Sequence, residues 1–449
     1  MTDASIDVGA QVRRSSLLSQ DEHTRKRNRA ETRFRAYGLA AITVAILLLA
    51  ILLVSIFSNG LSAFRQTNIS FSLELPADKL DKAGNRNAEE MKAVTTVGYS
   101  KVIAAGFVDA LAANGVETVG LKPKQILGML SESAPNSVRD RVLANPSLIG
   151  TTIQITLLAN SRIDGYFKGR VTAETAALDA KISPQQLRLA DAMKASGMLT
   201  QRFNIAFLTA PDASEKRPEA AGLGVAIIGS AYMMIVVLCL SLPIGVAAAV
   251  YLEEFAAKNR FTDVIEVNIS NLAAVPSIVF GILGLSVFIN FAHLPQSASI
   301  VGGLVLTLMT LPRIIIPARA ALKAVPPSIR DAALGVGASK MQTVFHHVLP
   351  LAAPGILTGM IIGLAQALGE TAPLLLIGMV AFVKEYPGLP PDGLFDPATA
   401  LPVQVYSWTQ RADPAFVERA SGAIIVLLVF LMVMNAVAIV LRRRFERRW

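Results

Sequence analysis

A single carboxylate stands in the middle of a long apolar run near the C-terminal end of the chain. The run covers residues 354–382, and Glu370 is its only charged residue. A charged side chain at the centre of a membrane span costs about 2.5 to 3.5 kcal/mol to insert, so it should face a pathway or a partner rather than lipid. We therefore expect a translocation pathway or gate formed by Gly369, Glu370, Thr371 and Pro373. The alternative is a Glu that pairs with a neighbouring helix for structure alone.

A second pattern precedes this run, in a loop expected at 319–350. An acidic-Ala-Ala triplet is followed by a glycine and then by a Leu-Pro pair (Asp331, Ala332, Ala333, Gly337, Leu349 and Pro350). Ser328 could cap a short helix beginning near Ile329, and Gly337 permits a sharp change of direction. The pattern predicts two short helices, or else an ordinary connecting loop with one capped helix.

Other kinds of chemistry find no support in the sequence. It contains no GxxxxGK[ST] phosphate loop, no serine elbow and no His/Cys/Asp cluster at metal-ligand spacing. Its single cysteine, Cys239, rules out an intrachain disulfide. We expect no catalytic residue, no metal and no cofactor, so any ATP would be bound and hydrolysed by a separate subunit.

The composition indicates a membrane protein. Of the 449 residues, 53% are hydrophobic and only 17% are charged. The net charge of +9 is concentrated in a basic arm at 1–36 and a basic tail at 442–449, directly beside apolar segments. Charges in these places indicate the cytoplasmic side of a membrane rather than a nucleic-acid site.

Six membrane spans are expected from the apolar runs. They are an anchor at 37–57, a span at 222–252, two spans within 267–312 separated by a turn at 290–297, a span at 354–382 and a last span at 420–441. With both termini inside, the segments 253–266 and 313–350 are inside and carry the Lys and Arg residues, as the positive-inside rule requires. The first run is too long for a typical signal peptide, although Leu61-Ser62-Ala63 allows cleavage as an alternative.

Between the first two spans, residues 58–221 have the composition of a soluble domain. Helical periodicity at 87–114 and 183–198, with strand patterns at 151–158 and 202–208, predicts a small mixed α/β fold. A packing or docking role is the interpretation we favour. The predicted fold class is thus an all-α polytopic membrane protein with this domain inserted on the periplasmic side, followed by a block of five helices at 222–441.

Gly355, Gly359 and Gly363 form a stripe of small residues along one face of the fifth span. Such stripes let helix backbones approach closely. We expect packing inside one bundle or between two subunits, and no ligand contact.

The triplet, the glycine and the Leu-Pro pair resemble the EAA loop of binding-protein-dependent ABC importer permeases, with Asp331 in place of the usual Glu. The resemblance implies that 331–350 is the coupling element that contacts a separate ATPase subunit.

The segment 369–376 resembles the corresponding helix of PstA-type permeases of phosphate importers. Residues 271–281 resemble the third span of that family, and residues 401–403 resemble its outside loop before the last helix. Together these resemblances imply that the five helices at 222–441 form an importer permease domain. Members often carry a basic residue where this chain has Gln366, so Arg313 is the candidate for the anion contact, or else an interfacial anchor. The resemblance implies phosphate import across the bacterial inner membrane. It also implies four partners: a second permease, an ATP-binding cassette ATPase dimer, a periplasmic phosphate-binding protein and the lipid bilayer. A permease for another oxyanion such as sulfate, a receptor with a sensor domain and a secondary transporter are the alternatives.

Overall fold

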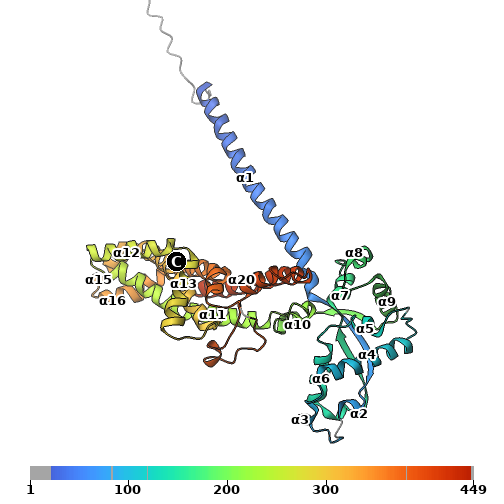
Figure 1. The fold of residues 1–449 in the computed structure, drawn as a ribbon. Helices are drawn as coiled ribbons and strands as arrows, with labels where there is room; N and C mark the ends of the chain where they lie inside the picture. Colours follow the sequence, from blue (N-terminus) through green and yellow to red (C-terminus); the bar gives the residue numbers. More distant parts are fainter. Residues whose placement is uncertain (1–21, 82–83, 119, 381, 446–449) are drawn as a thin grey trace, which may run out of the picture. The chain divides into compact units, whose positions relative to one another are not determined.

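The computed structural model describes residues 22–81, 84–118, 120–380 and 382–445. The chain forms two compact units, which divide between residues 55 and 56. The first consists, in its described part, of the helix α1 (Glu22–Gly60), which continues into the second unit (Figure 1). Most side chains of α1 are exposed along the apolar run, as expected of a helix surrounded by lipid. Residues 1–21 of the basic arm and 446–449 of the tail lie outside the described residues.

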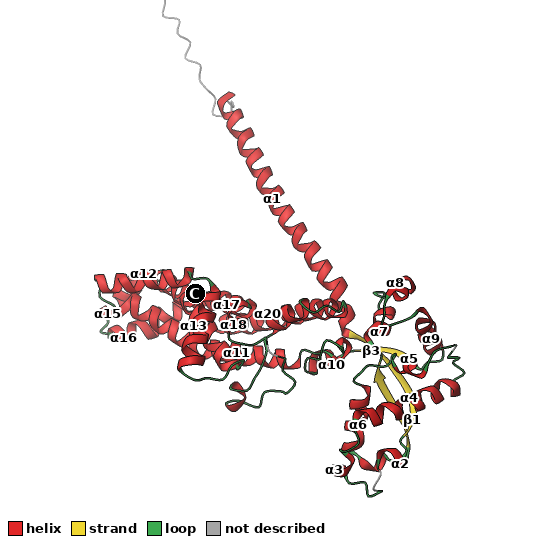
Figure 2. Cartoon of the chain, in the orientation of Figure 1, coloured by secondary structure: helices red, strands yellow, loops and turns green. Residues whose placement is uncertain are grey.

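The segment between α1 and α11 contains a three-stranded antiparallel sheet in the order β2-β1-β3 (Figure 2). The strands are β1 (Arg65–Glu74), β2 (Thr152–Leu158) and β3 (Leu199–Phe203). The helix α4 (Thr96–Ala113) packs on this sheet, and the rings of Phe71 and Phe107 lie 4.9 Å apart. The strand expected at 151–158 is confirmed as β2, whereas β1 was not predicted.

The strand expected at 202–208 is wrong beyond Phe203. The backbone turns there into a short helix, α10 (Ile205–Thr209), because the Asn204 side chain accepts a hydrogen bond from the backbone N–H of Phe207 at 3.1 Å. The other helices of this domain are α2 (Ala77–Leu80), α3 (Ala88–Met91), α5 (Pro123–Leu127), α6 (Ala134–Ala144), α7 (Ser161–Phe167), α8 (Ala173–Leu178) and α9 (Pro184–Ala195). Three short 3-10 turns complete it, η1 (Leu61–Phe64), η2 (Pro146–Leu148) and η3 (Pro218–Ala220).

Within the described residues, six helices are long and apolar enough to cross a membrane, or seven if one bent pair counts as a span. One of the six is α4, whose buried face packs on the sheet. The others are α1, α11 (Gly224–Val250), α14 (Ser299–Lys323), α17 (Leu349–Gly369) with the turn before it, and α20 (Ala415–Phe445).

The bent pair corrects the expectation of one continuous span from residue 267. Helix α12 (Arg260–Ala274) ends before Pro276, and α13 (Ser277–Leu283) continues at a bend of 104°. Pro276 has no N–H to donate and disfavours the helical conformation at Val275, which is extended here. The expected turn at 290–297 falls in the connection between this pair and α14.

Two other span boundaries also differ from expectation. Helix α14 continues to Lys323, so Arg313 lies within a helix rather than at the start of a loop. Helix α17 ends at Gly369, and only the short α18 (Ala372–Leu376) follows it, so the run 354–382 is not one helix. Residues 401–403, expected in a loop, begin the buried helix α19 (Leu401–Thr409).

The glycine stripe packs within the bundle, as one of its two interpretations predicted. A Cβ added at Gly355 would meet the Ala321 Cβ at 2.7 Å, and one added at Gly359 would meet the Pro317 Cβ at 2.6 Å. The backbones of α17 and α14 therefore lie in direct contact. Helices α12, α15 (Pro327–Gly335) and α16 (Lys340–Thr343) lie at one end of this bundle, and α10 lies at the other (Figure 1).

Candidate functional site

The break between α17 and α18 brings Glu370 to Arg313. The two side chains come from positions 57 residues apart in sequence, and Arg313 Nη1 lies 4.0 Å from Glu370 Oε1. Both are largely shielded, with side-chain exposures of 24% for Arg313 and 19% for Glu370. The distance is at the outer limit of an ion pair, so the two charges attract each other without closing a tight hydrogen bond.

The Arg313 guanidinium has a hydrogen-bond donor that is free to bind a ligand. Its Nη1 is buried and has no hydrogen-bond partner among the described residues. Gln366, one turn before Glu370 on α17, is exposed. A cationic donor and a carboxylate acceptor thus stand side by side within the bundle, an arrangement that can bind an anion carrying hydroxyl groups.

The chain around this pair is held by close packing against α13. A Cβ added at Gly281 would lie 2.7 Å from the Cα of Pro373, so α13 touches the start of α18 directly. Pro373 is buried, while Gly369 and Thr371 are not. The helix break that carries Glu370 is therefore fixed by its neighbours, and discontinuous spans of this kind line substrate sites in many transporters.

The second candidate site is the loop before α17. Helix α15 begins at Pro327 with no side-chain cap, so the expected cap at Ser328 is wrong: proline at the first helical position replaces it. Gly337 has a φ of +92°, which reverses the chain as predicted. The next helix, α16, is capped by Ser339, whose Oγ accepts from the N–H of Gln342 at 3.2 Å.

One face of this loop is open. Asp331, Ala332 and Gly337 are exposed, whereas Ala333 is buried. Val336 and Met341 are also exposed, at 86% and 58%. Exposed apolar side chains grouped beside a charged one indicate a surface that binds another protein. Leu349 and Pro350 open α17, so the loop is joined without a break to the helix that ends at the Glu370 site.

An ion pair that we did not predict holds α15 against the bundle. Arg330 Nη2 lies 2.6 Å from Glu254 Oε1, and Arg330 also donates to the carbonyls of Leu322 and Val325 at the end of α14. Arg319 pairs with Glu266 at 2.6 Å in the same region. The signal in the sequence was the acidic pair Glu253-Glu254 at the end of an uncharged run, which needed a cationic partner.

No group of three or more His, Cys, Asp or Glu side chains that could hold a metal ion occurs in the part of the chain that the structure describes. The two candidate sites are the pair of Arg313 and Glu370 within the bundle and the exposed loop at its end.

Comparisons with known proteins identify the family of the chain. Residues 241–449 match the family described as binding-protein-dependent transport system inner membrane component, and residues 21–177 match a domain of unknown function, DUF3333. The chain is 31% identical over 230 residues to the probable ABC transporter permease protein YqgI of Bacillus subtilis, covering 49% of this chain and 78% of that one. It is equally identical to the phosphate transport system permease protein PstA 1 of Mycobacterium tuberculosis, over 51% of this chain and 73% of that one. A solved structure of the MetNI methionine ABC transporter matches 50% of this chain and 95% of that chain, with a TM-score of 0.39 and 16% identity.

A multi-pass helical bundle with an exposed loop joined to a broken span is the architecture of a membrane permease subunit. The relatives place it among the ABC importers. The chain belongs to the binding-protein-dependent transport system permease family, with PstA-type permeases among its relatives and with an additional N-terminal domain.

Proposed function

We propose that this permease subunit carries inorganic phosphate across the bacterial inner membrane. The observation that carries the proposal is the pair formed by Arg313 and Glu370 within the bundle. The name of the PstA 1 relative, a phosphate transport system permease, points to the same cargo.

The pair favours phosphate over sulfate for a chemical reason. Near neutral pH, inorganic phosphate still carries at least one hydroxyl group, whereas sulfate carries none. The unpartnered Nη1 of Arg313 can donate to an oxyanion, while an ionised Glu370 can only accept. Phosphate can satisfy both groups, but sulfate would place a bare oxygen against the carboxylate. Unpaired or repelled groups of this kind are how a site rejects a wrong ligand.

The exposed loop is the proposed contact with the ATPase. Its apolar face, including Val336 and Met341, would bind an ATP-binding cassette ATPase, which binds and hydrolyses the ATP. The ion pair of Arg330 and Glu254 would transmit movement of the loop to α11 and α14. A second homologous permease and a periplasmic phosphate-binding protein complete the complex, which alternates between inward-open and outward-open states.

The same arrangement supports a periplasmic position for residues 65–221. The loop and this domain lie at opposite ends of the bundle (Figure 1). If the loop meets the ATPase in the cytoplasm, the domain faces the other side, with both termini inside.

Uptake of radioactive phosphate by cells lacking this gene, and then complemented, tests the proposal. We expect complementation to restore uptake and an excess of sulfate to leave it unchanged. Equal competition by sulfate, or no restored uptake of phosphate, would overturn the assignment of cargo.

The variant Glu370→Gln tests the site itself. The amide adds a donor beside Arg313, so discrimination against sulfate should fall while the subunit remains in the complex. Glu385→Gln is the matched control, because it makes the same change at an exposed carboxylate after α18. Unchanged selectivity in Glu370→Gln would reduce Glu370 to a structural residue.

A further inference from the structure

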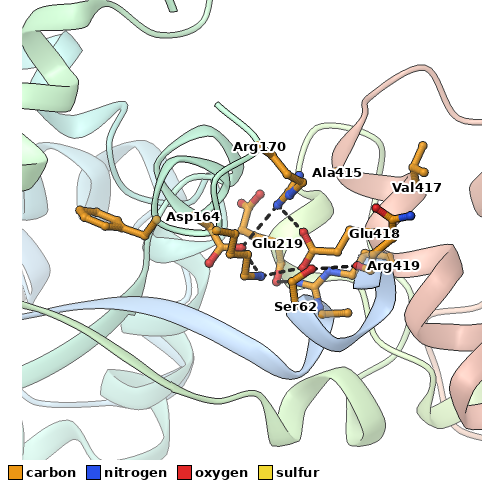
Figure 3. Close-up of polar contacts among 12 residues, drawn as sticks. Ser62, Asp164, Arg170, Glu219, Ala415, Val417, Glu418 and Arg419 are labelled. Carbon is orange, nitrogen blue, oxygen red and sulfur yellow. Dashed lines mark hydrogen bonds and ion pairs between the residues drawn. The ribbon is translucent and has the colours of Figure 1, made fainter. Parts of the chain in front are cut away.

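A cluster of buried charges joins the N-terminal domain to α20. Lys168 Nζ lies 2.6 Å from Asp164 Oδ2 and 2.8 Å from Glu418 Oε1, and all three side chains are at most 3% exposed. Arg170 pairs with the second oxygen of Glu418 at 2.5 Å. Figure 3 shows Asp164 and Arg170 of the domain and Glu418 at the start of α20 pointing toward one another.

Further polar contacts hold the same junction. Arg419 Nη2 donates to Gln66 Oε1 on β1 at 2.9 Å and to the carbonyl of Glu219 at 2.8 Å. Arg162 Nη1 lies 3.0 Å from Asp413 Oδ1. Because buried charges are strongly penalised when they lose their partners, the domain is held at this level of α20.

The position of the junction relative to the membrane follows from the length of the apolar part of α20. The apolar run 420–441 has 22 residues, enough to cross a hydrocarbon core about 30 Å thick, so its first residues lie at the edge of that core. A Cβ added at Gly422 would meet the Phe207 ring at 2.9 Å, and one added at Gly60 would meet the Ser421 backbone at 2.7 Å. The helix α10, which carries Phe207, and the end of α1 therefore lie at the membrane surface.

An exposed apolar patch surrounds this point. Phe203 and Ile205 are each 63% exposed, Leu61 is 56% exposed, and Phe64 stacks on Phe203 with ring centroids 6.3 Å apart. We call Leu61, Phe64, Phe203 and Ile205 the foot of the domain. Each lies within a few residues of a segment that touches the outermost turn of the apolar part of α20.

Two arginines border the foot. Arg65 pairs with Phe203 in the β1–β3 register, and Arg202 is the preceding residue on β3. Both are exposed, and neither forms an ion pair with another described residue. Apolar and aromatic side chains with arginines beside them are typical of the interface between hydrocarbon and lipid headgroups.

We propose that the foot inserts into the leaflet next to the N-terminal domain, with Arg65 and Arg202 on lipid phosphates. The N-terminal domain is thus anchored in the lipid bilayer through the foot, in addition to its contacts with the bundle. The occupant is lipid because the foot is continuous with the lipid-facing surface of the spans, at the depth that α20 sets. The inference does not depend on which solute is transported.

Spin labels on the full chain in phospholipid nanodiscs test this proposal. In a Cys239→Ser background, Phe203→Cys and Ile205→Cys each carry one label. Leu178→Cys is the matched control, because Leu178 is also apolar and is 91% exposed on α8, outside the foot. We expect collisions with oxygen, which is enriched in lipid, to exceed those with a water-soluble nickel chelate severalfold at 203 and 205, with the reverse at 178.

Two results would overturn the proposal. Chelate access at 203 and 205 equal to that at 178 would mean that the foot faces water. Protection from both reagents would mean that a protein partner covers it. If the labelled variants fold poorly, quenching of Phe203→Trp by brominated lipids, against Leu178→Trp, decides the same question. The double variant Arg65→Gln with Arg202→Gln should raise the access of the chelate to the label at 203. Unchanged access would show that the two arginines do not help to hold the foot in the membrane.

Discussion

The Glu219 carboxyl group is buried and accepts a hydrogen bond from the hydroxyl of Ser131. Burial raises the pKa of Glu219 above its ordinary value of 4.5, and the neighbouring Asp164 adds to the shift, whereas the Ser131 hydrogen bond and the charge of Arg419 oppose it. The folded protein therefore binds the Glu219 proton more tightly than the unfolded chain does.

This difference predicts a pH dependence of stability. Glu219 contributes stability that is fully present below pH 4.5, the ordinary pKa, and is lost as pH rises through the raised pKa of the folded state. Glu219→Gln keeps an acceptor for Ser131 but cannot ionise. We expect its thermal midpoint to fall less than that of the native chain between about pH 5 and about pH 8. Parallel pH curves for the two proteins would contradict this, and Glu174→Gln, at an exposed carboxylate, is the control.

At the scale of single residues, the sequence drew attention to Glu370 but could not identify Arg313 as its neighbour. A carboxylate in an apolar run needs a partner wherever it lies, because leaving it without one is costly. Its contact with Arg313 depends on α14 continuing past Pro312 and Pro317 to Lys323. A hydropathy pattern ends a span at its first charge, and for that reason Arg313 was expected at the inner end of a span.

Among the elements, the loop from α15 to α16 has its geometry set by Gly337. At a φ of +92°, a Cβ is strained against its own backbone, although no other atom lies within 4 Å of the added position. Gly337→Ala should therefore displace α16 relative to α15 and weaken ATPase association severalfold, with the subunit still inserted. Co-purification of the ATPase measures this effect.

Gly335→Ala is the matched control for that variant. Gly335 ends α15 with no atom within 4 Å of an added Cβ and without a positive φ, so association should be unchanged. Equal association of both variants would show that the conformation at Gly337 is not needed for coupling.

Helices defined by long-range contacts could not be predicted from local pattern. The two short helices of the loop and the strand at 151–158 were expected because their turn residues and alternation are local signals. The bend at Pro276 was missed because an uncharged run reads as one span whether or not it is bent. Helix α19 was missed because its burial depends on contacts from distant segments, such as the Ser230 hydroxyl that accepts from the N–H of Leu401 at 2.9 Å.

At the scale of the whole molecule, the question is how firmly the N-terminal domain is joined to the bundle. The centre of the link consists of the charged side chains of Lys168, Asp164 and Glu418, which are at most 3% exposed. Replacing such a pair with apolar groups is often neutral, whereas removing one partner leaves a buried charge alone at a cost of about 3 to 5 kcal/mol. The sequence could not reveal this junction, because Lys168 and Glu418 lie 250 positions apart and each reads as an ordinary surface charge.

A double-mutant cycle measures the strength of that junction. Lys168→Met leaves Glu418 with only Arg170, so opening of the junction should become about a hundredfold more frequent, as about 3 kcal/mol implies. Lys168→Met with Glu418→Leu removes both charges and should recover part of the loss. Trypsin cleavage after Lys216, in the segment between α10 and α11, reports the opening, because this bond lies beside the junction. The exposed pair of Lys92 and Glu89, 2.6 Å apart, is the control, and the same cycle there should give a coupling energy of about 0 to 1 kcal/mol.

Additive effects at Lys168 and Glu418 would mean that the two charges do not stabilise each other, and the domain would then be joined to α20 mainly by the apolar contacts around Phe207.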